Sequence, residues 1–166
     1  MRPYTSTLAL TLTMLMLAAA CQPDNRTSEP SVSPVETVNS MVTLESPYSV
    51  DETVERLRER LEDRGFMIPV VLDHQANAAR VDLTLPPTVV LLFGNPRAGT
   101  PLMQCEQRLG IDLPQKALVY EDEGGQVHLA YNNPLYLQQR HQAGPCGGAF
   151  ENAAEALAGL MAPVVE

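Results

Sequence analysis

Tryptophan is absent from the chain, and aromatic and basic side chains are scarce. Its 166 residues include 5% aromatic residues and 11 Lys and Arg against 20 Asp and Glu, for a net charge of −9. Such an acidic surface repels phosphates, which excludes a nucleic-acid binder. With 45% hydrophobic residues, the composition still suits one ordinary globular domain. It excludes collagen-like, coiled-coil and fully disordered chains.

The chain also lacks a hydrophobic run long enough to cross a membrane. The apolar run from Leu8 to Leu17 is too short to span a bilayer, which requires about 20 residues. Arg2 precedes this run, and three alanines follow it directly before Cys21. The arrangement resembles the signal peptide and lipobox of bacterial lipoproteins, although Ala18 stands where the lipobox usually has leucine. The resemblance implies lipid on Cys21; the alternative is an ordinary secretory signal that leaves Cys21 as a free thiol.

Four segments follow from this pattern. We expect residues 1–20 to be a signal peptide, and residues 21–40 to be a lipidated Cys and a disordered tether rich in Pro, Ser and Thr. Residues 41–142 are predicted to form the globular domain, and residues 143–166 to add a loop and a closing helix. Several acyl chains on one Cys hold a domain stably at a bilayer. Because Gln22 follows the Cys where an inner-membrane retention signal usually has Asp, we expect an outer-membrane anchor facing the periplasm.

Hydrophobic spacing in the globular part predicts an α+β fold. The capping pair Ser49 and Glu52 begins a helix that ends at Gly65. Thr100 and Pro101 are expected to begin another helix, because Thr is a good N-cap and Pro is tolerated at the first helical position. The predicted strands are 41–44, 67–72, 88–93, 116–121 and 126–131, the last two forming a hairpin, and the remaining predicted helices are 74–80, 134–141 and 150–161.

Several short motifs resemble a known family. They are Asp73–Ala78, Phe93–Pro96, Gly99–Gln104, Asp112–Pro114 with Lys116, Leu118–Asp122, and Tyr131–Pro134 with Tyr136, Leu137, Arg140 and His141. In this order they resemble the bacterial "domain of unknown function 302" family over roughly residues 47–142. The resemblance implies an α+β domain with a curved, antiparallel-containing sheet backed by helices, similar to the TATA-box-binding-protein fold. It implies no reaction, since the family has none assigned.

Two segments are candidates for a ligand or reaction site. Asp73 and His74 follow a predicted strand, where a carboxylate and an imidazole could perform acid–base chemistry. The alternative is that Asp73 only caps the next helix. Between Gly94 and Thr100 the spacing copies the start of a phosphate-binding loop, but Thr100 replaces the required Lys. Arg97 and backbone amides could still hold a small anion.

Sulfur and imidazole side chains suggest a third kind of site. Met103, Cys105, Cys146, His74 and His141 include enough soft ligands for copper or zinc, but no metal-binding spacing joins them. After lipidation an even pair of cysteines remains in an oxidising compartment, so we expect a Cys105–Cys146 disulfide. His128 is expected to face solvent.

Three classes of function remain open at this point. The preferred hypothesis is a lipid-anchored binding module without catalysis or cofactor, whose partner is a small ligand or an envelope protein, with a homodimer possible. Its ligand-binding candidates, expected to converge if the second and third strands are neighbours, are Asp73, His74, Asn95, Arg97, Met103 and Gln104. The alternatives are an enzyme that uses His74 on a small anionic substrate and a metal- or redox-handling protein.

Replacement of Cys21 with Ala tests the membrane anchor. The wild-type chain is expected to partition into detergent with the added mass of lipid, because acyl chains supply the membrane affinity. The variant should be soluble or unprocessed. Fractionation of cells and intact-mass measurement check both outcomes, and identical mass and fractionation for the two chains would contradict the lipobox interpretation.

Overall fold

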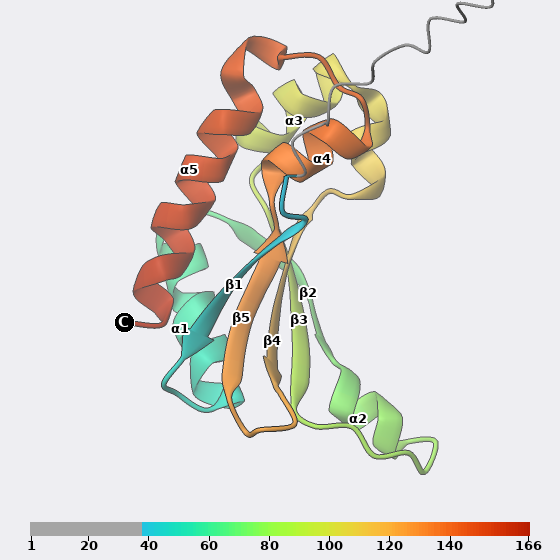
Figure 1. Ribbon diagram of the computed structural model, residues 1–166, viewed down its shortest axis with the longest axis vertical. Coiled ribbons are helices and arrows are strands. Elements are labelled where there is room, and N and C mark those ends of the chain that lie inside the picture. The colour runs from blue at the N-terminus through green and yellow to red at the C-terminus, as the bar shows by residue number, and fades with distance from the viewer. Residues whose placement is uncertain (1–37) are drawn as a thin grey trace, which may run out of the picture. The chain divides into compact units, whose positions relative to one another are not determined.

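A five-stranded antiparallel sheet with the order β1-β5-β4-β3-β2 organises the domain (Figure 1). The computed structural model describes residues 38–166, so the predicted signal peptide, Cys21 and most of the predicted tether lie outside the described residues. The strands are β1 (Met41–Ser46), β2 (Met67–Asp73), β3 (Thr88–Gly94), β4 (Gln115–Glu121) and β5 (Val127–Asn132). The helices are α1 (Val50–Asp63), α2 (His74–Ala79), α3 (Pro96–Cys105), α4 (Pro134–Arg140) and α5 (Ala149–Met161), with short 3-10 turns η1 (Gln107–Ile111), η2 (Cys146–Gly148) and η3 (Ala162–Val164).

Strand alternation buries one face of this sheet. Successive side chains of a strand point to opposite faces, so every second residue of β3, β4 and β5 enters the same core. These side chains pack with α1 and α5, and the fully buried ones are Leu91, Phe93, Ala117, Val119 and Leu129. The α+β class and the one-sided covering by helices therefore agree with the expectation from the sequence.

Helices α1 and α5 are joined by side chains as well as by the core. The α1 helix begins where Ser49 Oγ accepts a hydrogen bond from the Glu52 backbone N–H, at 3.2 Å. From the same helix, Arg56 Nε donates to the Val164 carbonyl at 2.7 Å and Arg60 Nε to the Leu160 carbonyl at 3.2 Å. These carbonyls lie at and beyond the C-terminal end of α5, where backbone acceptors lack helical partners. Two arginines of one helix thus fix the end of the other.

A second, smaller core forms a cap at one end of the sheet. We use "cap" for α3, η1, α4, η2 and the first turn of α5. Its buried side chains come one from each of four elements, and they are Leu102, Leu109, Leu137 and Phe150. Cys105 and Cys146 lie at disulfide-bonding distance within the cap, with Cα atoms 5.9 Å apart. This cysteine pair joins the end of α3 to η2, the turn that precedes α5.

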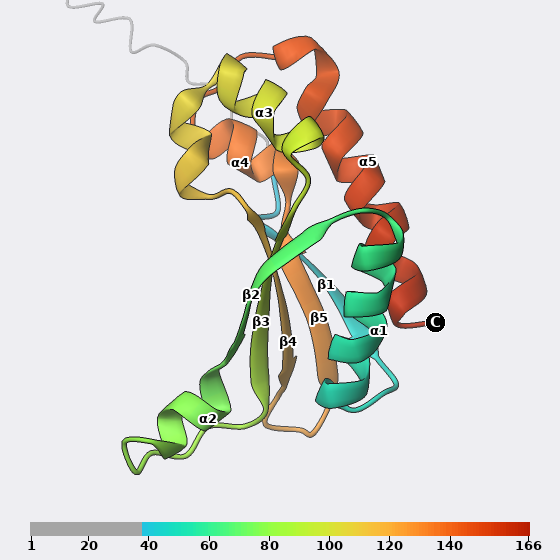
Figure 2. The ribbon, with the colours of Figure 1, turned by 180° about the vertical axis from the view of Figure 1, so that it is seen from behind.

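An arm projects from the opposite end of the sheet. We use "arm" for residues 74–87, which comprise α2 and the loop that returns to β3. Both views show the arm beyond the ends of the strands and away from α1 and α5 (Figure 2). No residue of α2 is buried. The arm is therefore joined to the domain by β2 and β3 and contributes little to either core.

Two local predictions were wrong. Helix α3 begins at Pro96 rather than near Thr100, because the Asn95 side chain caps it by accepting a hydrogen bond from the Arg97 N–H at 2.9 Å. Pro101 consequently lies inside the helix. His128 does not simply face solvent: its side chain is 15% exposed, stacks on Tyr120 and contacts Asp122 at 2.8 Å.

The proximity of Cys105 and Cys146 predicts that the two thiols are oxidised to a disulfide. A bond across a sequence separation of 41 residues should stabilise the fold by about 4 kcal/mol on the chain-entropy model. Alkylation before and after reduction, followed by intact-mass measurement, should show no free thiol at either position until reductant is added. Two alkylated thiols in the unreduced protein would exclude the bond.

Candidate functional site

The six ligand-binding candidates from the sequence do not converge. Strands β2 and β3 are neighbours, as supposed, but they are antiparallel: Asp73 pairs with Val89, and Met67 pairs with Gly94. Asp73 and His74 therefore lie at the arm end of the sheet. The other four candidates, Asn95, Arg97, Met103 and Gln104, lie in or beside α3 at the cap end. Convergence would have required the two segments to follow parallel strands, so that expectation was wrong.

Asp73 has the role that the simpler sequence interpretation gave it. Its Oδ1 accepts a hydrogen bond from the Ala76 N–H at 2.9 Å, and it is the N-cap of α2. An Asx side chain in this position satisfies one of the unpaired amides of the first helical turn. The Asp73 carboxylate, which the acid–base hypothesis paired with His74, thus accepts a hydrogen bond from the α2 backbone.

The strongest site is a pocket between the cap and the end of the sheet. It has a volume of about 530 Å³, which lies within the range of small-molecule sites. Its wall includes one face of α5, the first two turns of α3 and the ends of β3 and β4. The lining residues are Phe66, Met67, Phe93, Gly94, Asn95, Pro96, Ala98, Gly99, Thr100, Pro101, Leu102, Met103, Leu113, Pro114, Gln115, Ala149, Asn152, Ala153, Ala156 and Leu157.

This cap pocket includes two of the six sequence candidates. Asn95 and Met103 line it, whereas Arg97 and Gln104 are exposed and do not. The spacing of the lining residues on α5 repeats every three to four positions, which places them on one face of the helix. None of the lining residues is charged. The pocket is therefore apolar, with a few uncharged polar groups.

Gln115 supplies an unused hydrogen-bonding group in the wall of this pocket. Its side-chain Oε1 is buried and has no hydrogen-bond partner among the described residues. A buried polar atom without a partner costs about 1–3 kcal/mol. The Asn95 Oδ1, by contrast, already accepts from Arg97 N–H. Sequence reasoning missed Gln115, because a glutamine at the start of a strand carries no motif.

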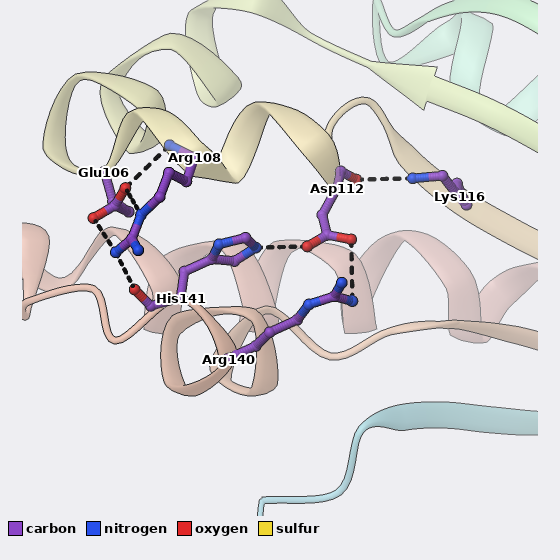
Figure 3. Close-up of polar contacts among 6 residues, drawn as sticks. All are labelled: Glu106, Arg108, Asp112, Lys116, Arg140 and His141. Atoms are coloured by element: carbon purple, nitrogen blue, oxygen red, sulfur yellow. Dashed lines mark hydrogen bonds and ion pairs between the residues drawn. The ribbon is translucent and has the colours of Figure 1, made fainter.

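A buried contact between Asp112 and His141 supports the wall that contains Gln115. Asp112 Oδ2 and His141 Nε2 are 2.6 Å apart, and their side chains are 10% and 9% exposed (Figure 3). Arg140 Nη1 lies 3.4 Å from the other carboxylate oxygen, and Lys116 Nζ donates to the Asp112 carbonyl at 3.1 Å. His141 and Arg140 thus join the C-terminal end of α4 to Asp112, and the Lys116–Asp112 contact links the two residues that flank segment 113–115, so together they hold that segment beside the pocket.

A second ion pair at the surface adds to the same connection. Glu106 accepts from Arg108 Nε at 2.8 Å, and Arg108 Nη2 also donates to the His141 carbonyl at 3.1 Å (Figure 3). The hydrogen bonds from the Arg108 side chain and backbone lower the pKa of Glu106 to about 2. The same pairing raises the pKa of Arg108. Glu106 is therefore ionised throughout the physiological range.

The titratable candidates are engaged in structural contacts. His141 Nε2 contacts Asp112 Oδ2, and Asp73 Oδ1 accepts a hydrogen bond from the α2 backbone. Within residues 38–166, no three His, Cys, Asp or Glu side chains lie close enough to share a metal ion. Cys105, Cys146 and His141 therefore do not form the metal site that was one of the alternatives.

The protein is an α+β domain whose antiparallel sheet is covered by helices on one face, with the cap pocket at one end of the sheet. The family model "Domain of unknown function DUF302" matches residues 42–163, and the chain belongs to this family. A crystal structure of an uncharacterized conserved DUF302 protein from Bacillus stearothermophilus has a similar fold, with a TM-score of 0.70. The two share 21% sequence identity, and the match covers 78% of this chain and 100% of the other. The range 42–163 matched by the family model includes the closing helix α5.

Curated relatives with higher identity are longer proteins. The chain is 44% identical over 106 residues to the fluoride-specific ion channel FluC 1 of Brucella suis biovar 1, which covers 64% of this chain and 42% of that protein. The FluC 1 protein of Brucella abortus biovar 1 matches equally, with 39% of its length covered. The chain thus spans about two fifths of the length of these relatives. None of the helices among residues 38–166 is long and apolar enough to cross a membrane.

Substitution of Asp112 tests the buried pair. We expect Asp112→Asn to lower the free energy of unfolding by about 2 kcal/mol, because it removes a charge-assisted hydrogen bond and leaves the His141 imidazole in a buried site. The matched control is Asp122→Asn, which alters the more exposed Asp–His pair at the other end of the sheet. Denaturant unfolding of both variants measures the difference. Equal losses would show that the Asp112 pair has no special role.

Proposed function

We propose that this chain is a non-catalytic binding module, anchored to a cell-envelope membrane through lipid on Cys21, that takes a small and largely apolar ligand into the cap pocket. The observation that carries the proposal is the conjunction of an uncharged, carbon-lined pocket with the buried, unpartnered Oε1 of Gln115. Apolar pockets with a few convergent polar groups are the usual form of small-ligand sites.

The lining determines the chemistry of the ligand. An apolar body would replace water along the exposed lining residues Met67, Pro101 and Ala156, which favours binding in proportion to the carbon surface buried. A hydrogen-bond donor on the ligand would satisfy the buried Gln115 Oε1 once that side chain turns toward the pocket. A charged ligand is disfavoured, since no lining side chain could compensate for its lost hydration. This also disfavours the enzyme alternative, whose substrate was expected to be an anion oriented by Arg97.

The proposed anchor would hold the cap close to the membrane. Val38, the first described residue, lines a shallow hollow beside α4 with Leu135 and Gln139. Sixteen residues separate Cys21 from Val38, and a chain of that length reaches at most about 60 Å. The pocket would therefore lie within reach of apolar molecules that leave or enter the bilayer surface.

A second candidate function is that of an accessory domain for a membrane transport protein. The Brucella relatives that carry the matching segment are named fluoride-specific ion channels, and the match leaves more than half of each of them uncovered. Since a channel needs membrane-spanning segments, the uncovered part would supply them. A separately anchored copy of the domain could serve a separate transport protein. Specific co-purification of such a protein with the chain would favour this candidate.

A neutral, fluorescent apolar amine tests the pocket. N-Phenyl-1-naphthylamine has an apolar body and one N–H donor, and its emission should rise when it binds the full-length chain. We expect Ala153→Phe, which fills the pocket from α5, to weaken this binding at least tenfold. The matched control is Ala158→Phe, an exposed position of the same helix outside the lining, which should bind normally.

Gln115→Leu separates the polar from the apolar contribution in the same titration. Loss of one neutral hydrogen bond should weaken binding about fivefold, whereas stability should not fall because a buried unsatisfied atom is removed. Melting curves establish that each variant is folded, and Ala156→Phe provides a second filling variant. Equal affinity of the wild type and both filling variants would refute binding in the cap pocket.

A further inference from the structure

The face of the sheet opposite α1 and α5 has no covering element among the described residues. We use "open face" for the side chains that strand alternation directs to this side. They are Met41, Thr43, Glu45, Val70, Leu72, Thr88, Val90, Leu92, Lys116, Leu118, Tyr120, His128, Ala130 and Asn132. The set is mainly apolar, and it contains one acidic and one basic residue. In a chain of net charge −9, the open face is close to neutral.

Exposed hydrophobic side chains are concentrated beside this face. Among the described residues, seven of nine exposed large hydrophobics lie between positions 67 and 85; the seven are Met67, Val70, Val71, Leu72, Val81, Leu83 and Leu85. Val81 and Leu83 of the arm are 64% and 65% exposed. Of these seven, Val70 and Leu72 belong to the open face and Val81, Leu83 and Leu85 to the arm, and groups of exposed apolar side chains of this kind often mark binding surfaces.

The arm cannot cover the open face of its own chain. It continues beyond the ends of β2 and β3, and neither view shows it folding back over the sheet (Figures 1 and 2). Its helix α2 has no buried residue. Among residues 38–166, the projecting arm and the open face are therefore two apolar surfaces that do not contact each other.

We infer that the open face and the arm form a two-fold interface with a second copy of this chain. In a two-fold pair each contact occurs twice, so the arm of each copy can lie on the open face of the other. Val81, Leu83 and Leu85 of one copy would then be covered by β2 and β3 of its partner. One two-fold pairing would bury both uncovered surfaces, so no unrelated partner would be needed.

Charge and size also favour a second copy. Two acidic molecules repel one another, and the nearly neutral open face is the surface on which that repulsion is smallest. The open face and the arm together offer about as many residues as one side of a standard interface, which has 20–30. The pairing would also shield the free edge of β2, whose apolar side chains would otherwise promote aggregation.

Co-purification of two tagged copies tests the interface. Full-length chains with different tags are expressed in the same cells, solubilised in mild detergent and captured through one tag. We expect the second tag to be recovered with the first. Leu83→Glu on both copies should reduce recovery at least tenfold, because it places a carboxylate in an apolar contact; the high exposure of Leu83 means that the domain itself should remain folded.

Ile111→Glu is the matched control. Ile111 is 74% exposed but lies in η1, outside both the open face and the arm, so recovery of the second tag should be unchanged. Leu72→Glu provides a second variant on the open face itself. Absence of the second tag from the wild-type capture would overturn the inference. So would equal recovery with Leu83→Glu and Ile111→Glu, or capture of a different protein in place of the second copy.

Discussion

One-sided burial of the sheet is the constraint on which the other features of the domain depend. Residues of one parity in β3, β4 and β5 enter the core against α1 and α5, and residues of the other parity do not. The energy of this arrangement comes from removing apolar surface from water. Because the helices cover one side only, the opposite side is left mainly apolar and open. The same alternation that builds the core therefore also creates the surface that we assign to a second copy.

The cap has a different physical basis from the main core. It depends on short elements held by specific polar contacts, of which the buried Asp112–His141 pair is the most enclosed. A buried carboxylate is costly unless it has partners, so the contacts of Asp112 with His141 and Arg140 fix how α4 meets the segment before β4. That segment carries Gln115 into the wall of the pocket. Polar contacts outside the pocket thus hold an apolar wall in position. The charged and titratable residues of this support do not line the pocket.

The two Asp–His pairs illustrate why residue types alone do not establish a reaction. Both pairs could be mistaken for acid–base machinery, but Asp112 and His141 are enclosed by packing, and Asp122 caps the β4–β5 turn through hydrogen bonds from Gly124 and Gln126. His128 lowers the pKa of Asp122 most, by a side-chain hydrogen bond. Membership of the DUF302 family and the shared fold assign no chemistry to either pair.

The sequence by itself determined most of the elements, because hydrophobic periodicity and capping residues act over a few positions. It thereby predicted α1 and the β4–β5 hairpin, and it pointed to the family through short motifs. Only the tertiary structure decided that β2 and β3 run antiparallel, which sends Asp73 and Asn95 to opposite ends. It also revealed the pairing of Asp112 with His141 and the orphaned Gln115 Oε1. These contacts join residues distant along the chain, and no local pattern encodes them.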